Sequence, residues 1–358
     1  MPLLARGTLS SYGVRTPALL VDLDAMDRNL RRMAAYFRDR SAKLRPHFKG
    51  HQVLSLASRQ VQAGAIGIAC ARIEHAEKLV SAGVQNVLIA NQIGGEGMVR
   101  TYIDLSRKAP VIAAVDSPHL VADMARLAGN HRSALNIVVD INLGLNRCGV
   151  TPGAAAVALS RVVLEKGLSF RGLMGYRGNL RLPAGLEKKQ LVTSAMETLV
   201  ATKCLLEQDG IPVQMISSGG TTDYAIVGGH PGITEVQAGS YMLMDQWKAQ
   251  FAADFTPALS IMTTVLSCND NGQVVTDGGI KAMSAYRGSP KVKDIPGLAL
   301  KALHAEHCLM EITDPSITIE VGDQLEIWVE YLDATISRHR QMYGFRNGNL
   351  QEIFEIEH

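Results

Sequence analysis

A regular alternation of short apolar runs and amphipathic segments constrains the fold of this chain most. The amphipathic segments, such as 72–82, 119–127, 153–165 and 188–208, have helical periodicity. Short apolar runs rich in Val, Ile and Ala separate them, at 43–45, 66–70, 87–90, 111–115, 135–141, 172–176, 213–217 and 235–240. Apolar strands between helices are typical of a parallel sheet that is covered on both faces. About eight such units in roughly 200 residues predict a closed (β/α)8 barrel of the TIM type.

The pattern differs at both ends of the chain. Before the barrel, residues 18–23 indicate a strand and residues 25–36 a helix, for which Asp24 is a candidate cap. After about residue 254, turn signals replace the long helices, and strand patterns occur at 259–267, 273–277, 309–312 and 324–331. We therefore expect two domains. A barrel covers residues 15–253, and an all-β domain covers residues 254–358 together with residues 1–14.

Composition excludes several classes of protein. The net charge of the 358 residues is +2, and no basic block indicates a nucleic-acid partner. None of the five scattered cysteines forms a Cys-x-x-Cys pair, which argues against a disulfide framework and fits a reducing cytosol. No run approaches the roughly 18–20 apolar residues of a membrane span, and the N-terminus lacks the apolar core of a signal peptide. We expect a cytoplasmic protein that binds neither nucleic acid nor membrane.

Lys49 is the strongest candidate for a catalytic residue. It stands between His47 and His51, directly after the first barrel run. Cationic or titratable neighbours can lower the pKa of a lysine amine, and only the neutral amine is a nucleophile. The alternative is an ordinary surface lysine in a basic loop. The carboxyl ends of barrel strands are where such folds build their sites, so the position favours a Schiff-base lysine.

Arginine, aromatic and small polar residues follow four of the other predicted barrel strands. Glycine-rich loops let backbone N–H groups approach an anion, so the loops after the seventh and eighth strands predict a phosphate site. Each group also has an ordinary interpretation, namely a surface ion pair, a core aromatic or a simple turn. A lysine that forms an imine, a phosphate cradle and a ring partner together predict pyridoxal 5′-phosphate (PLP). The residues are Arg147, Tyr176, Ser218, Gly219, Gly220, Thr221, Gly239, Ser240 and Tyr241.

The chain resembles the fold-type III PLP enzymes, the alanine-racemase-like group, and within it the D-threonine aldolase and D-serine dehydratase family. The resemblance is carried by residues 16–24, 45–51, 144–149, 218–222, 235–241, 277–284 and 306–307. It implies a PLP-binding barrel, a β domain that closes the active site, and a homodimer. It also implies that Lys49 holds PLP as a Schiff base, with Arg147 near the ring hydroxyl and Tyr176 beside the cofactor. The small polar residues of the last two loops, from Ser218 to Thr221 and from Gly239 to Tyr241, would surround the phosphate.

The resemblance further implies a divalent metal (Mn, Mg or Zn) near the C-terminus. Its ligands are a histidine and, two residues later, an aspartate in the aldolases or a cysteine in the dehydratases. Asp333 matches the aspartate and is the candidate metal ligand, whereas Tyr331 stands in place of the histidine. A phenol is a poor ligand because it must first lose a proton with a pKa of about 10. Either Asp333 binds a metal weakly, or the metal is absent and Tyr331 hydrogen-bonds the substrate, or Tyr331 faces away on a strand.

These features favour a PLP-dependent lyase that acts on a small D-amino acid. We expect an aldolase that cleaves a D-3-hydroxy amino acid, of the D-threonine or D-3-hydroxyaspartate type, to glycine and an aldehyde or keto acid. His51 is a candidate base or water organiser, or simply a structural loop histidine. Arg177 hints at a substrate with a second carboxylate. The alternatives, in order, are a D-serine or D-3-hydroxyaspartate dehydratase, an amino-acid racemase, which needs acid/base groups on both faces of Cα, and a non-catalytic PLP-binding protein.

Overall fold

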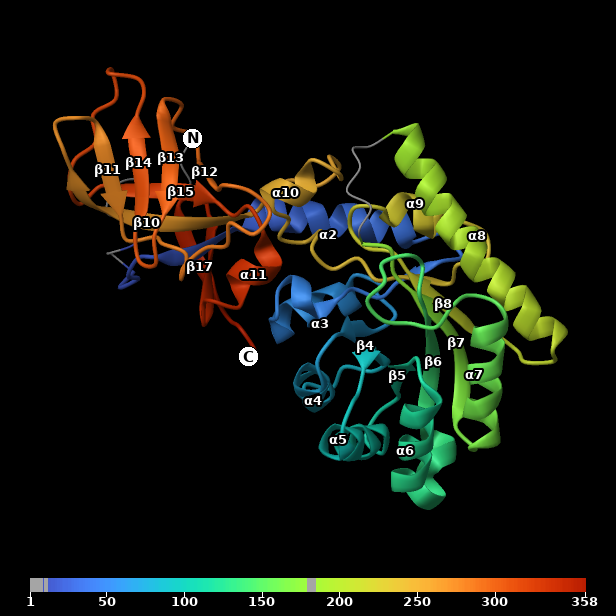
Figure 1. The fold of residues 1–358 in the computed structure, drawn as a ribbon. Coiled ribbons are helices and arrows are strands. Elements are labelled where there is room, and N and C mark those ends of the chain that lie inside the picture. Colours follow the sequence, from blue (N-terminus) through green and yellow to red (C-terminus); the bar gives the residue numbers. More distant parts are fainter. Residues whose placement is uncertain (1–8, 10–11, 179–184) are drawn as a thin grey trace. The chain divides into compact units, whose positions relative to one another are not determined.

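The structure is a computed structural model that describes residues 9, 12–178 and 185–358 (Figure 1). The chain divides into two compact units. One, here called the barrel unit, comprises Arg32–Lys49 and Leu54–Gly239. The other, here called the β unit, comprises Met1–Arg31, Gly50–Val53 and Ser240–His358. The domain limits expected from the sequence stay a prediction, and residues 1–8 and 10–11 of the expected β domain lie outside the described residues.

Eight parallel strands form the sheet of the barrel unit, in the order β2-β9-β8-β7-β6-β5-β4-β3. Backbone hydrogen bonds from Ile66 N to Leu44 O and from Ala69 N to Pro46 O join the two ends of this sheet and close it. The predicted barrel is confirmed. The strands are β2 (Lys43–Leu44), β3 (Ile68–Cys70), β4 (Val87–Gln92), β5 (Val111–Val115), β6 (Asn136–Ile141), β7 (Ser169–Gly175), β8 (Met215–Ser218) and β9 (Glu235–Val236).

Amphipathic helices follow these strands, and successive helices from α4 to α8 pack against one another (Figure 1). In α6 (Pro118–Ala128) the buried residues Val121, Met124, Ala125 and Ala128 recur at helical spacing, and Ser117 caps the first turn by accepting from Leu120 N at 3.2 Å. No helix in the described part of the chain is long and apolar enough to cross a membrane. The other helices are α3 (Leu54–Gln62), α4 (Ile73–Ser81), α5 (Glu96–Ser106), α7 (Ala154–Glu165), α8 (Leu186–Gln208) and α9 (Tyr224–Gly228), with 3-10 turns η1 (Phe48–Gly50) and η2 (Gly129–Ala134).

A buried ion pair joins the first and last strands of the barrel. Arg45 directly follows β2, which pairs with β9. The Arg45 guanidinium donates from Nε to Glu235 Oε1 at 2.8 Å and from Nη2 to Oε2 at 2.9 Å. The side chains of Arg45 and Glu235 are only 5% and 4% exposed. This bidentate geometry gives both buried charges their hydrogen bonds, so it fixes the register of β2 against β9.

The β unit contains a nine-stranded, mostly antiparallel sheet with the order β13-β14-β11-β10-β1-β16-β17, and β15 pairs with both β10 and β12. Besides the first part of α2 (Leu23–Phe37), its described helices are short, namely α10 (Gln246–Ala249) and α11 (Leu332–Ile336). Residues 254–358 contain only α11, so the expected all-β character of the C-terminal part is confirmed. The strands are β1 (Ala18–Asp22), β10 (Leu259–Cys268), β11 (Gln273–Thr276), β12 (Lys291–Val292), β13 (Leu298–Leu303), β14 (Cys308–Ile312), β15 (Gln324–Trp328), β16 (Gln341–Arg346) and β17 (Asn349–Glu355).

The strand expected before the barrel is confirmed as β1, which pairs antiparallel with β10 and parallel with β16 because it buries Leu20 against Met262 and Phe345 of those strands. Two other local predictions are wrong. The helix α2 (Leu23–Phe37) is capped by Asp22, whose Oδ1 accepts from Ala25 N at 2.9 Å, and not by Asp24. The strand expected over 324–331 ends at Trp328, and the residue at 331 is the N-cap of α11.

Candidate active site

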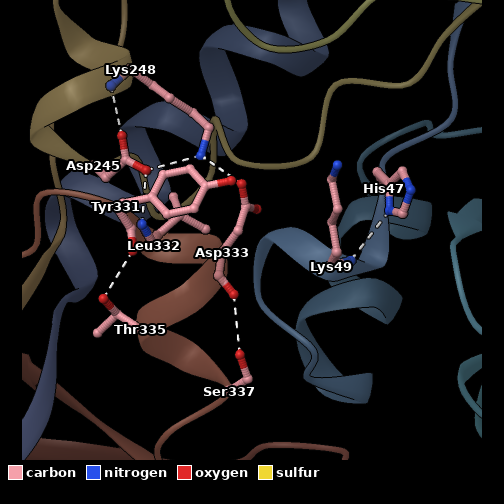
Figure 2. Close-up of polar contacts among 9 residues, drawn as sticks. All are labelled: His47, Lys49, Asp245, Lys248, Tyr331, Leu332, Asp333, Thr335 and Ser337. Carbon is pink, nitrogen blue, oxygen red and sulfur yellow. Dashed lines mark hydrogen bonds and ion pairs between the residues drawn. The ribbon is translucent and has the colours of Figure 1, made fainter. Parts of the chain in front are cut away.

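Lys49 lies in the 3-10 turn η1, just beyond the carboxyl end of β2. Its backbone N–H donates to His47 Nδ1 at 3.3 Å, which holds the turn in place (Figure 2). The Lys49 side chain is exposed, and its Nζ lies 6.0 Å from the centroid of the Tyr176 ring. Tyr176 follows β7, so the barrel brings a lysine and an aromatic ring together from strands that are far apart in the sequence.

The loop after β8, the seventh barrel strand, also lies next to Tyr176. A Cβ atom at Gly220 would lie 3.7 Å from that ring, in ordinary contact and clear of any backbone. Gly219 has a φ of +73°, which favours glycine. Ser218 Oγ donates to Gly175 O at 2.7 Å, and Gly220 N donates to Asp223 Oδ1 at 2.7 Å. The loop is therefore internally ordered, and Gly220 lies beside the Tyr176 ring.

Gly239 is required by close packing next to Lys49. A Cβ atom at this position would lie 2.2 Å from the carbonyl oxygen of His47, so any side chain would displace the backbone that leads into Lys49. The two residues that follow belong to the β unit. There Ser240 O accepts from Met244 N at 2.7 Å, and the fully buried Tyr241 ring lies 5.8 Å from Phe255.

Arg147 lies in the loop after β6, close enough to Asp140 for its charge to act on that carboxyl. Burial raises the pKa of Asp140 to about 6, which a hydrogen bond from Gln92 at 2.8 Å and the charge of Arg147 only partly offset. Asn142 shapes the loop by accepting from Gly144 N at 2.9 Å and from Asn146 N at 3.1 Å. A carboxyl that titrates near neutral pH at a strand end is a recurrent feature of functional sites. Our sequence analysis did not single out Asp140, because burial leaves no local signal.

We expect Asp140 to make the protein less stable as the pH rises from about 4 to about 6. The folded chain holds a proton on this group that an unfolded chain, with an aspartate pKa of about 3.9, has already lost. Asp140→Asn keeps an acceptor for Gln92 and removes the titration. Relative to wild type, it should raise the free energy of unfolding by up to about 2–3 kcal/mol above pH 6 and change it little at pH 4. Urea unfolding at several pH values measures this, with the exposed Asp270→Asn as control, and a gain that does not vary with pH would contradict it.

A second charged cluster lies within the β unit (Figure 2). Lys248 Nζ lies 2.9 Å from Asp245 Oδ2 and 3.0 Å from Asp333 Oδ2. Asp245 is fully buried and also accepts from the backbone nitrogens of Lys248 at 2.6 Å and Leu332 at 2.9 Å. Burial alone would lower the pKa of Lys248, but the charges of Asp333 and Asp245 outweigh it and hold that pKa above its ordinary value. Lys248 is therefore a permanent ammonium.

Tyr331 completes this cluster. The centroid of its ring lies 4.8 Å from Lys248 Nζ. Burial, the charge of Asp333 and a hydrogen bond to Asp333 raise the pKa of Tyr331, against the opposing charges of Lys248 and Arg287. The phenol thus stays protonated at neutral pH and acts as a donor to the Asp333 carboxylate. It is not a strand residue that faces away.

The side chains of this cluster do not form a suitable set of ligands for a divalent metal. The Asp333 carboxylate already accepts from an ammonium and a phenol, and the phenol would have to lose its proton to become a ligand. Within residues 9, 12–178 and 185–358, no group of three or more His, Cys, Asp or Glu side chains could hold a metal ion. The geometry makes Asp333 an ion-pair partner of Lys248 and gives no support to its predicted role as a metal ligand.

Arg287 is a further residue that the sequence analysis missed. The Cζ atom of its guanidinium lies 4.6 Å from the ring centroid of Tyr286, 4.8 Å from that of Trp247 and 5.4 Å from that of Tyr331. Its buried Nε has no hydrogen-bond partner among the described residues. Arg177 Nε is likewise buried without a hydrogen-bond partner among the described residues, so both arginines are candidates for binding a carboxylate.

Of the remaining predicted residues, Thr221 is buried in the loop after β8, and His51 lies in the short segment of the β unit at 50–53. It is fully buried, and its Nδ1 accepts from Val53 N at 3.1 Å. In the barrel unit, Lys188 supports the loop after β8 by donating from Nζ to Thr222 O at 2.5 Å. Lys188 was also missed, because a contact across 34 residues leaves no trace in local sequence.

Comparisons with known proteins cover almost the whole chain. The family model described as alanine racemase, N-terminal domain, matches residues 21–246, and that of a putative serine dehydratase domain matches residues 258–345. The chain is 30% identical over 351 residues to a D-threonine aldolase of Arthrobacter sp, and 28% identical over 356 residues to a 3-hydroxy-D-aspartate aldolase of Paracoccus denitrificans (strain Pd 1222). Each alignment covers 96% of this chain and 92% of the relative. The crystal structure of D-threonine aldolase from Filomicrobium marinum is similar with a TM-score of 0.92 and 32% identity, over 96% of this chain and 95% of that one.

Proposed function

We propose that this chain, which belongs to the alanine racemase N-terminal domain family, is a PLP-dependent aldolase that cleaves a D-3-hydroxy amino acid to glycine and an aldehyde or keto acid. The observation that carries the proposal is the similarity over 96% of the chain to aldolases named for D-threonine and 3-hydroxy-D-aspartate. Lys49, placed at the end of β2 and facing the ring of Tyr176, supports it. The stacked guanidinium of Arg287 supports a substrate with a second carboxylate.

The barrel unit offers groups of the kind that PLP needs. Lys49 would hold the cofactor through Nζ, with Tyr176 beside the ring and Arg147 near the ring hydroxyl. At Gly220 an added Cβ would be in ordinary contact with the ring of Tyr176 and the carboxyl of Asp223, so the loop passes beside the ring where the phosphate would be held. When bound, PLP supplies an electron sink for the carbanion left by cleavage of the substrate's Cα–Cβ bond. The phosphate would lie among Ser218, Gly219, Gly220, Thr221, Gly239, Ser240 and Tyr241.

The hydrogen bonds of His51 and Tyr331 limit what each can do for the substrate hydroxyl. Because His51 Nδ1 accepts from Val53 N, a neutral imidazole carries its proton on Nε2. In that tautomer His51 suits the ordering of a water or a hydroxyl better than the role of a base. Tyr331 likewise holds its proton but donates it to the Asp333 carboxylate, so its oxygen can still accept a hydrogen bond. We propose that both orient the substrate, His51 as a donor and Tyr331 as an acceptor.

Product analysis tests the aldolase directly. Incubation of the PLP-loaded protein with D-threonine or D-3-hydroxyaspartate should release glycine in amounts equal to the aldehyde or keto acid, measured by mass spectrometry. L-threonine is the control and should be cleaved at least roughly 100-fold more slowly, since a chiral site misplaces its hydroxyl. Absence of glycine from every D-substrate would contradict the proposal.

A dehydratase is the second candidate, and the match of residues 258–345 to the putative serine dehydratase domain favours it. It would release ammonia and a keto acid from D-serine or D-3-hydroxyaspartate, and no glycine. A racemase would change the optical rotation of D-alanine, and a PLP carrier would bind the cofactor without turnover. The same incubations separate these alternatives.

We also infer that the protein is a cytoplasmic homodimer. All five cysteines are free thiols in the structure, which suits a reducing compartment. Light scattering coupled to size-exclusion chromatography should give twice the chain mass of 38.6 kDa. A single-chain mass at micromolar concentration would contradict the dimer.

A further inference from the structure

Lys248 places a positive charge at the point where the side chains of the β-unit cluster converge. Asp245 Oδ2 and Asp333 Oδ2 lie 2.9 Å and 3.0 Å from its Nζ, and the Tyr331 ring centroid lies 4.8 Å from it. The Lys248 side chain is only 11% exposed, and the two carboxylates are 0% and 19% exposed. An ammonium between two largely buried carboxylates is a fixed part of the fold and not a mobile surface charge.

The distances from Nζ to the two carboxylates are those of hydrogen bonds to an ammonium, 2.9 Å and 3.0 Å. Carboxylate oxygens bind Mg²⁺ or Zn²⁺ at the shorter distance of about 2.0–2.2 Å, so a metal ion at the Nζ position would require both carboxylates to move inward. A divalent ion between Asp245 and Asp333 would also have to displace Lys248 Nζ or lie against it. The cation and the ammonium are both positive, and their repulsion is strong in a buried site. Arg287, 5.4 Å from the Tyr331 ring, adds to the positive charge around the cluster.

We propose that the Lys248 ammonium takes the place of a divalent metal in this chain, so that the cluster of Asp245, Lys248, Tyr331 and Asp333 works without a bound metal. The two residues at 331 and 248 act together in this replacement. A phenol at 331, which is a poor metal ligand, hydrogen-bonds Asp333, and the lysine at 248 neutralises the carboxylates that a metal would otherwise bind. Lys248 thereby positions Asp333 and Tyr331. Its effect on turnover rests on the proposed function, whereas its effect on metal binding does not.

The first measurement uses the wild-type protein. After treatment with EDTA and dialysis, titration with Mn²⁺ followed by electron paramagnetic resonance should detect no stoichiometric binding. One tightly bound Mn²⁺ per chain that Asp333→Asn abolishes would overturn the proposal. This arm needs neither PLP nor substrate, so its result is independent of whether the protein is an aldolase.

The second measurement attempts to create a metal site. Lys248→Ala combined with Tyr331→His removes the ammonium and adds an imidazole beside Asp245 and Asp333. We expect the double variant to bind one Mn²⁺ per chain, roughly 100-fold or more tightly than wild type. Tyr331→His alone is the matched control and should bind weakly, since the ammonium remains. If Lys248 had only a structural role, its removal in the double variant would not create a metal site.

A folding control distinguishes a variant that binds no metal from one that does not fold. Circular dichroism shows whether the double variant is folded, and a folded double variant without gain in Mn²⁺ affinity would overturn the proposal. Should that variant unfold, the wild-type titration decides by itself. In the activity arm, EDTA should leave wild-type turnover unchanged and abolish that of the double variant. A wild type without turnover would count against the proposed function and leave the Mn²⁺ result intact.

Discussion

Replacing Lys49 with alanine is expected to abolish activity, with a fall in kcat on the order of 10⁴-fold or more, as is typical when a covalent nucleophile is removed. The side chain projects from the turn after β2, and its Nζ lies 6.0 Å from the centroid of the Tyr176 ring. The protein should also lose the visible absorbance of a lysine-bound cofactor while its far-UV circular dichroism stays unchanged.

Chemical labelling gives this prediction a second readout. Reduction of the PLP-loaded wild type with borohydride, followed by peptide mass spectrometry, should place the cofactor on Lys49. Lys189→Ala removes an exposed lysine of α8 and should behave as wild type. Cofactor attached to a different lysine, or a Lys49→Ala protein that retains full turnover, would refute the assignment.

Arg45→Met is expected to lower the free energy of unfolding by about 3–5 kcal/mol, because it leaves the buried carboxylate of Glu235 without its partner. The same guanidinium also donates from Nη1 to the carbonyl oxygen of Asn86, so a link to the loop before β4 is lost as well. Stability is measured by urea unfolding monitored by circular dichroism.

Two further variants separate charge burial from packing. Arg45→Met combined with Glu235→Leu removes both charges and should recover much of the loss, since an apolar pair can replace a buried ion pair. Arg100→Met removes half of an exposed pair with Glu96 and should cost less than about 1 kcal/mol. A loss for Arg45→Met no larger than for Arg100→Met would show that the buried ion pair between β2 and β9 does not stabilise the barrel.

The barrel strands could be predicted because each buries a short apolar run on both faces, and this leaves a pattern that is visible in sequence. The strands β5 and β6 agree with the expected runs to within one residue. The exceptions have physical reasons. The apolar run of β1 does not reveal which sheet it joins, and Tyr331 continues a strand-like pattern although its backbone already caps α11.

Some residues of the candidate site could likewise be predicted from the sequence, and others could not. Lys49, Tyr176 and the glycine-rich loop after β8 could be predicted, since parallel strands bring their carboxyl ends to one rim and each residue follows its strand directly. Asp140 and Lys188 could not, because their roles come from burial and from contacts with residues distant in sequence. The predicted role of Asp333 depended on a motif alone, and the motif does not contain the lysine that pairs with it.

By itself the sequence determined the barrel, the all-β C-terminal part, and the lysine that marks the site, because periodicity and strand order are local properties of the chain. Only the tertiary structure decided what Asp333 and Tyr331 do. Lys248 lies 85 residues before Asp333, and the local sequence of neither segment predicts their contact at 3.0 Å. The charge of a buried group is set by its neighbours in space, and those neighbours are chosen when the chain folds.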